Sequence, residues 1–158
     1  EKPIDHQKLS AIITKLIEDK RHSEKASRID LTRTLQTILF DPDEFGNYPP
    51  ETLESAFLSS LFSIFSDGAN KLLVKIKQAI EEEDIEQFKN HIHALKGIAG
   101  NVKAKRLEAI TRQCLDLDRD RFLIKENTAY LADNLTNCLN QTNQALFQYL
   151  KDEAGSNH

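Results

Sequence analysis

Apolar residues recur three and four positions apart over most of this chain, which is the spacing of one face of an α-helix. No strand-like alternation of any length occurs. Near the N-terminus the pattern predicts a helix ending near residues 21–23, with an apolar stripe made of Leu9, Ile12, Ile13, Leu16 and Ile17. A second, short helix is expected to begin at Asp30 as its N-cap and to carry Leu31, Leu35, Ile38 and Leu39.

The segment from Asp41 to Pro50 is full of turn-forming residues and is the best candidate boundary in the chain. Beyond it the pattern predicts four helices, at about residues 51–82, 84–102, 107–117 and 126–151. The first is expected to kink or break at Asp67-Gly68. In the first, third and fourth helices the residues expected to face inward are Phe57, Leu61, Phe65, Leu72, Ile76, Ile80, Leu107, Ile110, Cys114, Leu117, Leu131, Leu135, Cys138, Thr142, Ala145 and Tyr149.

Short connections between successive helices favour antiparallel neighbours. The predicted fold class is therefore all-α, an antiparallel up-down four-helix bundle with an N-terminal helical extension. We expect the extension or linker over residues 1–50, the bundle over residues 51–152 and a flexible tail over residues 153–158. Because the apolar stripe of the first helix must be covered, the extension is expected to pack against the bundle, away from His93.

The composition is that of a soluble globular domain, with 158 residues of which 39% are hydrophobic and 29% charged. The apolar runs are too short for a membrane span or a signal peptide, so no membrane contact by this fragment is expected. The net charge of −4 argues against a nucleic-acid partner. A small basic cluster, Lys103, Lys105 and Arg106, is interpreted as a solvated helix start.

The chain contains two cysteines, Cys114 and Cys138, and each follows the apolar rhythm of its own helix. We expect both to be buried free thiols, which fits a reducing cytoplasm. The sequence begins at Glu1 and contains no methionine. We therefore expect it to be a fragment or a processed form of a longer polypeptide.

The most informative stretch lies in the second predicted helix of the bundle, where Lys89, His93, Lys96, Gly97 and Gly100 fall within roughly 60° of one line on the polar side. The apolar stripe, which faces away from them, is made of Ile85, Phe88, Ile92, Leu95, Ala99 and Val102. Each glycine inside a helix costs about 1 kcal/mol relative to alanine. Two of them on a polar face indicate an approach surface for another protein. The alternative, close packing of another helix, fits their polar placement less well.

The imidazole of His93 is a good nucleophile near neutral pH. Lys96, three residues on, places an ammonium on the same face, where it could offset the charge of a phosphoryl group on the ring. Gly97 removes a side chain that would obstruct an in-line transfer. His91 lies two residues away and points about 160° from His93, so the pair cannot share a metal ion. His91 is expected to be a boundary residue with a structural hydrogen bond, and no metal site is predicted.

The stretch His93-Ala94-Leu95-Lys96-Gly97-Ile98-Ala99-Gly100-Asn101-Val102 resembles the signature of histidine-containing phosphotransfer (HPt) domains, in which His-x-Leu-Lys-Gly is followed by small residues. The similarity covers roughly residues 52–150. It implies a four-helix bundle whose exposed histidine passes phosphoryl groups between receiver-domain aspartates. By position, it implies His93 as the phosphorylated residue, Lys96 as the charge partner and Gly97 as the residue that leaves clearance for the partner.

Two positions depart from the pattern of that family. Lys103 stands where many members have a glycine, so either the following turn is shaped differently or the helix runs on. Leu115 stands where the family often has a glutamine or glutamate that hydrogen-bonds the imidazole. The nearby Gln113 and Asp116 point elsewhere on an ideal helix.

These features predict a cytoplasmic phosphorelay intermediate of two-component signal transduction. The resemblance implies that it comes from a hybrid sensor histidine kinase, for example as the soluble C-terminal part of a membrane-anchored one. The resemblance implies receiver domains as partners, and Lys89, Asn90, Gly100 and Lys103 are expected to contact them. No nucleotide-binding motif is present. The chain is therefore expected to carry phosphohistidine with no kinase site and no cofactor of its own, Mg²⁺ being expected only in the receiver. The alternative is a non-catalytic interaction module that docks through the Gly97/Gly100 face.

Overall fold

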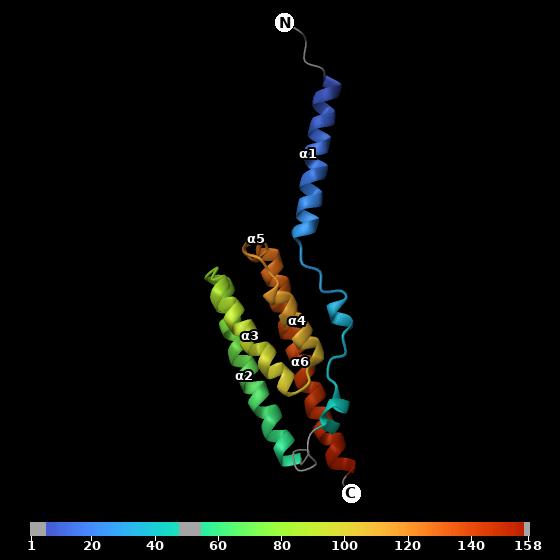
Figure 1. The fold of residues 1–158 in the computed structure, drawn as a ribbon, viewed down its shortest axis with the longest axis vertical. Helices are drawn as coiled ribbons and strands as arrows, with labels where there is room; N and C mark the ends of the chain where they lie inside the picture. Colours follow the sequence, from blue (N-terminus) through green and yellow to red (C-terminus); the bar gives the residue numbers. More distant parts are fainter. Residues whose placement is uncertain (1–5, 48–54, 157–158) are drawn as a thin grey trace.

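The computed structural model describes residues 6–47 and 55–156, and these residues form helices without any strand. Four helices pack in a ring, α2 (Ser55–Glu81) on α3 (Ile85–Asn101), α3 on α4 (Lys105–Leu115), and α4 and α2 on α6 (Lys125–Ser156). Neighbouring helices run in opposite directions (Figure 1). The single turn α5 (Arg119–Phe122) joins α4 to α6. The predicted all-α antiparallel bundle is confirmed.

Helix α2 departs from the sequence prediction at two places. It passes through Asp67-Gly68 without interruption, so the predicted kink is wrong. A Cβ on Gly68 would meet Ile98 Cδ1 at 3.6 Å, so this glycine lies where α3 comes close. Phe57, expected inside, is 47% exposed, because Leu58 takes the inward place one residue later.

The core lies between the four helices, and one ring contact in it joins Phe88 of α3 to Phe122 of α5, with centroids 5.1 Å apart. Both cysteines are buried free thiols, as predicted. Burial raises the pKa of Cys114 to about 12 and raises the pKa of Cys138 as well. Helix α6 continues to Ser156, past the limit of residue 152 that the sequence suggested.

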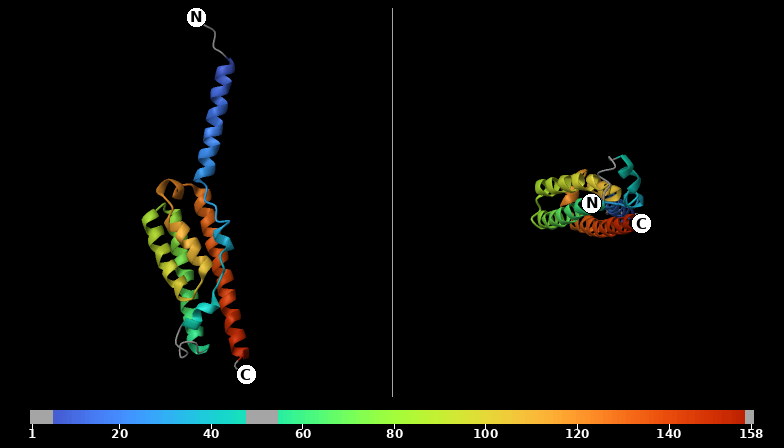
Figure 2. Two further views of the ribbon diagram at one scale, coloured as in Figure 1. Left: turned by 45° about the vertical axis from the view of Figure 1, so that its right-hand side comes forward. Right: turned by 90° about the horizontal axis from the view of Figure 1, so that it is seen from below.

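Residues 28–47, called here the N-terminal strap, lie along the α4 and α6 side of the bundle (Figure 2). Two 3₁₀ turns, η1 (Thr34–Gln36) and η2 (Pro42–Asn47), are its only regular elements. Leu31 and Phe40 of the strap are buried in the same core as the helices. The Phe40 ring packs edge-on against Phe62 of α2 and Tyr149 of α6. The strap is therefore part of the bundle's packing.

The prediction of a short helix beginning at Asp30 is wrong. A local hydrogen bond and burial of side chains in the bundle core compete with helix formation here. Asp30 Oδ1 accepts a hydrogen bond from Thr32 N at 2.9 Å, which closes an Asx turn in place of a helical cap. The strap then follows an irregular path that buries Leu31 and Phe40 while leaving Ile38 57% exposed. Burial of these two side chains outweighs the weak helical period.

Helix α1 (His6–Ser27) extends beyond the end of the bundle (Figure 1), and it ends later than residues 21–23. The residues of its apolar stripe, called here the α1 stripe, are Leu9, Ile12, Ile13, Leu16 and Ile17. They are between 46% and 62% exposed. The expectation that the bundle covers this stripe is wrong, because the extension packs through its strap and not through its helix.

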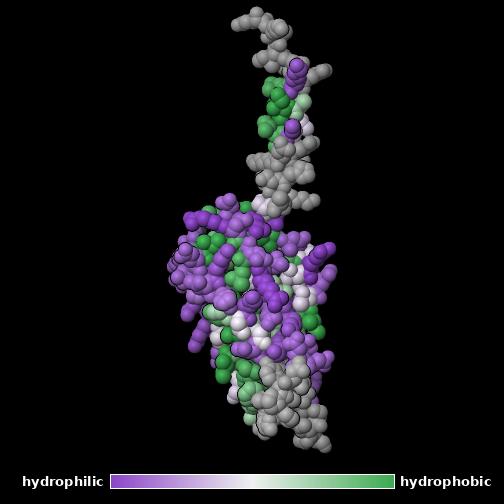
Figure 3. Space-filling model, in the orientation of Figure 1, coloured by the Kyte–Doolittle hydropathy of each residue, from purple (hydrophilic) through white to green (hydrophobic). Residues whose placement is uncertain are grey.

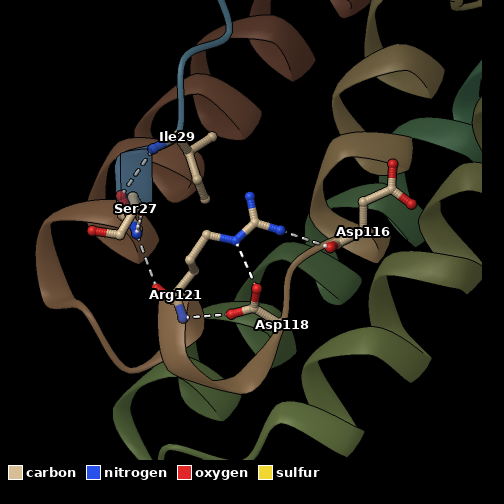
Figure 4. Close-up of polar contacts among 6 residues, drawn as sticks. Ser27, Ile29, Asp116, Asp118 and Arg121 are labelled. Carbon is tan, nitrogen blue, oxygen red and sulfur yellow. Dashed lines mark hydrogen bonds and ion pairs between the residues drawn. The ribbon is translucent and has the colours of Figure 1, made fainter. Parts of the chain in front are cut away.

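One side chain fixes the junction between α1, α5 and α6. Asn127, in the first turn of α6, is 3% exposed. Its Nδ2 donates to Ser27 O at 2.8 Å and to Arg121 O at 3.0 Å, and its Oδ1 accepts from Ile29 N at 3.1 Å (Figure 4). Arg121 in turn donates from Nε to Asp118 Oδ2 at 3.0 Å. The C-terminus of α1 therefore meets the N-terminus of α6, and the two helices run in the same direction.

Candidate functional site

Helix α3 carries the candidate residues, and its N-terminus and buried face set its orientation. Asp84 is the N-cap, and its Oδ1 accepts from Gln87 N at 3.1 Å. The face buried in the bundle consists of Phe88, Ile92, Leu95 and Ala99. The sequence placed this helix and its inward face correctly.

His93 lies on the opposite, exposed face of α3. Its imidazole makes no hydrogen bond or ion pair with any residue that the structure describes. Asn90 is exposed one turn before it, and Lys89 and Lys96, both partly buried, flank it at i−4 and i+3. The predicted polar surface around the histidine is therefore assembled on one helix.

Gly97 and Gly100 differ in what surrounds them. A Cβ built on Gly97 meets nothing within 4 Å, so the space one turn after His93 is open to solvent. A Cβ on Gly100 would come within 2.8 Å of Glu108 Oε1, which belongs to α4. The clearance at Gly97 faces outward as predicted. The clearance at Gly100 accommodates a carboxylate of the same chain, so the interpretation of Gly100 as open partner surface is corrected.

The contact between Gly100 and Glu108 also sets which part of α4 lies beside His93. Helices α3 and α4 are antiparallel, and Gly100 of α3 lies level with Glu108 of α4. Seven residues span about 10 Å on either helix, so a residue seven positions before Gly100 lies level with the residue seven positions after Glu108. His93 thus comes level with Leu115, which is partly buried against the core. The side chain at this level is aliphatic and offers the imidazole no hydrogen bond.

Helix α3 ends at Asn101, and Lys103 occupies the position after its C-cap Val102. Lys103 has φ of 59°, in the left-handed region that favours glycine. Lys103 N donates to Gly100 O and Ala104 N donates to Ala99 O, the hydrogen bonds of a Schellman turn. The turn therefore keeps the form that a glycine would give, and the helix does not run on.

The basic cluster after α3 holds the strap. Lys105 Nζ lies 2.8 Å and Lys103 Nζ 3.8 Å from the carboxylate of Glu44, while Arg106 Nε donates to Thr37 O at 2.9 Å. The hydrogen bond from Lys105 lowers the pKa of Glu44, and the same bond raises the pKa of Lys105. The interpretation of this cluster as a solvated helix start is wrong. Lys103, expected to contact a partner, already has one within the chain.

Two neighbouring residues complete the description of α3. His91 is partly buried, as a boundary residue should be, but its expected hydrogen bond is not made to any described residue. Lys89 lies toward the turn between α4 and α5. A backbone hydrogen bond from Arg121 is the main cause that lowers the pKa of Asp118, and the charge of Lys89 contributes a smaller part.

Within residues 6–47 and 55–156, no three histidine, cysteine or acidic side chains are grouped so that they could hold a metal ion. None of the helices in these ranges combines the length and apolar character needed to cross a membrane.

Sequence reasoning missed Glu44, Glu108 and Asn127, all of which matter to the site or its support. Glu44 and Asn127 join segments about 60 and 100 positions apart in sequence, so no local pattern marks them. The signal for Glu108 was available: in an antiparallel pair joined by a short turn, Gly100 and Glu108 lie at matching distances from that turn.

The described residues form an antiparallel helical bundle with an exposed histidine on α3 and open space one turn beyond it. Residues 60–145 match the model of the Hpt domain family, which is more than half of the chain. The chain belongs to this family, whose members act in phosphotransfer in two-component signalling and interact with receiver domains. No curated protein and no solved structure matches it.

Proposed function

We propose that His93 is the phosphorylated residue and that the chain is a phosphorelay intermediate, which takes a phosphoryl group from one receiver-domain aspartate and passes it to another. The observation that carries this proposal is the exposed imidazole of His93, which makes no hydrogen bond within residues 6–47 and 55–156, beside the open space at Gly97. The receivers belong either to separate response regulators or to the same hybrid kinase.

In this transfer the main contribution of the chain is to position the nucleophilic imidazole of His93. A ring nitrogen of neutral His93 attacks the phosphorus of the aspartyl phosphate, the P–N bond forms, and the P–O bond to the aspartate breaks. The carboxylate leaves with the electron pair, and the proton on the other ring nitrogen stays in place. The second transfer reverses these events on another aspartate. Mg²⁺ is assigned to the acidic site of the receiver.

Lys96 is proposed as the charge partner. It lies one turn from His93, so its ammonium can approach the equatorial oxygens of the phosphoryl group during transfer. Lys89, at i−4, reaches the same surface from the other side. Gly97 leaves room for the receiver's loops to close over the ring, and Asn90 lies on the face that the receiver would cover.

The experiment is transfer from a phosphorylated receiver to the purified chain and to two variants. His93→Gln should take up no phosphoryl group, whereas His91→Gln, two residues away, should behave like the unmodified chain. The phosphorylated chain should lose its label in acid and keep it in alkali, as a P–N bond does. Uptake by His93→Gln, or an acid-stable label, would show that the phosphoryl group resides elsewhere.

A further inference from the structure

The α1 stripe is an apolar surface that its own bundle does not cover. Its five residues are at least 46% exposed although they lie within nine positions of one helix. Figure 3 shows their side chains gathered on one side of α1, above the top of the bundle. Isolated apolar side chains on a surface are ordinary, but a contiguous aliphatic stripe on a projecting helix is typical of an interaction site.

The stripe has the pattern of a helix-pairing seam. Leu9, Ile13 and Leu16 are spaced four and three apart, which is the spacing of the residues that form the seam of a coiled coil. Ile12 and Ile17 widen the seam on its two sides. Leu9, Ile12, Ile13 and Leu16 are symmetric about the midpoint between Ile12 and Ile13, so this part of the stripe matches itself when a second copy runs in the opposite direction.

The position of α1 decides between parallel and antiparallel pairing. The stripe faces the side on which most of the bundle lies (Figures 1 and 3). A parallel partner would bring its own bundle into the space of the first. An antiparallel partner, centred between Ile12 and Ile13, sets residue 6 of one helix level with residue 19 of the other. That is eight residues, about 12 Å, short of the C-terminal end of α1.

We propose that α1 pairs antiparallel with α1 of a second copy of this chain through the α1 stripe. Five side chains bury about 400 Å² on each helix, roughly half of the 800 Å² per partner found in stable complexes. The pair is accordingly weak and forms in the range of roughly 10–500 µM chain. The Asn127 junction holds α1 away from the bundle and keeps its stripe available.

The first test is sedimentation equilibrium of the whole chain over that concentration range. The unmodified chain should approach twice its monomer mass as concentration rises. Leu16→Lys should remain monomeric throughout, and Ala11→Lys, which adds the same charge on the opposite, exposed side of α1, should associate as the unmodified chain does. A monomeric unmodified chain at the highest concentration overturns the proposal, as does association of Leu16→Lys.

The second test fixes the direction of pairing. Residue 9 of one copy should lie level with residue 16 of the other, so mild oxidation of a mixture of Leu9→Cys and Leu16→Cys should yield mainly the mixed disulfide. The native thiols are buried and do not compete. Disulfides formed faster between two Leu9→Cys chains than in the mixture would overturn the antiparallel arrangement.

Discussion

Gly97 is the residue at which stability and the proposed function make opposite demands. It lies inside an exposed stretch of helix with nothing within 4 Å of its Cβ position, so alanine there should stabilise the protein by about 1 kcal/mol. A long side chain at this position should likewise not destabilise the fold, but it should clash with the receiver domain when that domain docks. Urea unfolding and phosphotransfer rates, measured on the same variants, separate the two effects.

We expect Gly97→Gln to keep the helix content of the chain and to slow transfer by roughly 10- to 100-fold. Gly100→Ala is the matched control on the same helix, because its methyl group would displace only the Glu108 carboxylate. It should leave transfer nearly unchanged. Equal slowing by both variants, or none by Gly97→Gln, would contradict the assignment of Gly97 to partner clearance.

The sequence was sufficient to place His93 and Gly97 on the exposed face of α3, because the period of a helix fixes which side chains share a face. It was not sufficient to predict the surroundings of Gly100. Whether the space beside a glycine is open depends on the neighbouring helix, and the carboxylate of Glu108 enters that space from α4. The same limit applies to Lys103, whose sequence position near the helix end was clear but whose pairing with Glu44 was not.

Glu83 gives a second prediction at the scale of one residue. It follows α2 with φ of 55°, and its turn repeats the hydrogen bonds found at Lys103. A non-glycine residue in this left-handed conformation destabilises the folded state by about 1–2 kcal/mol. Glycine removes that strain, but its greater conformational freedom in the unfolded chain offsets part of the gain. Glu83→Gly should therefore raise the free energy of unfolding by about 0.5–1 kcal/mol.

The matched control for that change is Glu81→Gly, at the last residue of α2. It introduces the same side-chain loss at a helical φ and should lower the free energy of unfolding by a similar amount. If both variants were destabilised alike, the left-handed conformation of Glu83 would not be a source of strain.

At the scale of elements, the strap is where the sequence prediction failed. The period from Leu31 to Leu39 is compatible with a short helix, and no sequence pattern shows that Leu31 and Phe40 will be drawn into a core made by distant helices. The four bundle helices were predicted closely because each is long enough for its own periodicity to dominate. Short apolar segments depend instead on what they pack against.

The ion pair that holds the strap should be lost in acid. The pKa of Glu44 is lowered in the folded chain, so its contribution to stability is present above the ordinary glutamate pKa and is lost as the pH falls through the lowered value. The free energies of unfolding of the unmodified chain and of Glu44→Gln should therefore differ at pH 7 and converge as the pH falls through that lowered pKa. Asp43→Asn, next to it and exposed, should unfold like the unmodified chain at pH 7. A difference that persists in acid would mean that Glu44 acts by packing.

At the scale of the whole molecule, the folded unit begins before the residues that match the Hpt family. The match starts at residue 60, whereas buried contacts begin with Leu31. A chain of residues 28–156 should have a free energy of unfolding within about 1 kcal/mol of that of the full chain, because the apolar side chains described in α1, over residues 8–17, are all exposed. A chain of residues 55–156 should lose at least ~3 kcal/mol, since it leaves the places of Leu31 and Phe40 empty.

Urea denaturation followed by circular dichroism measures these differences. If the 55–156 chain were as stable as the full chain, the strap would cover the bundle without contributing to its free energy of unfolding. A large loss on removing α1 alone would show that α1 makes contacts in solution beyond the Asn127 junction.

The path of the strap has a mechanical consequence. A pull applied at the N-terminal end of α1 would be borne first by Asn127 and Tyr130, both on α6, through their hydrogen bonds to Ile29 and Leu31. Tension reaches the end of α3 only farther along, where Asp41 N is bound to Lys103 O. A force on α1 would thus act mainly on one side of the bundle, and the helix that bears His93 would be displaced less than α6.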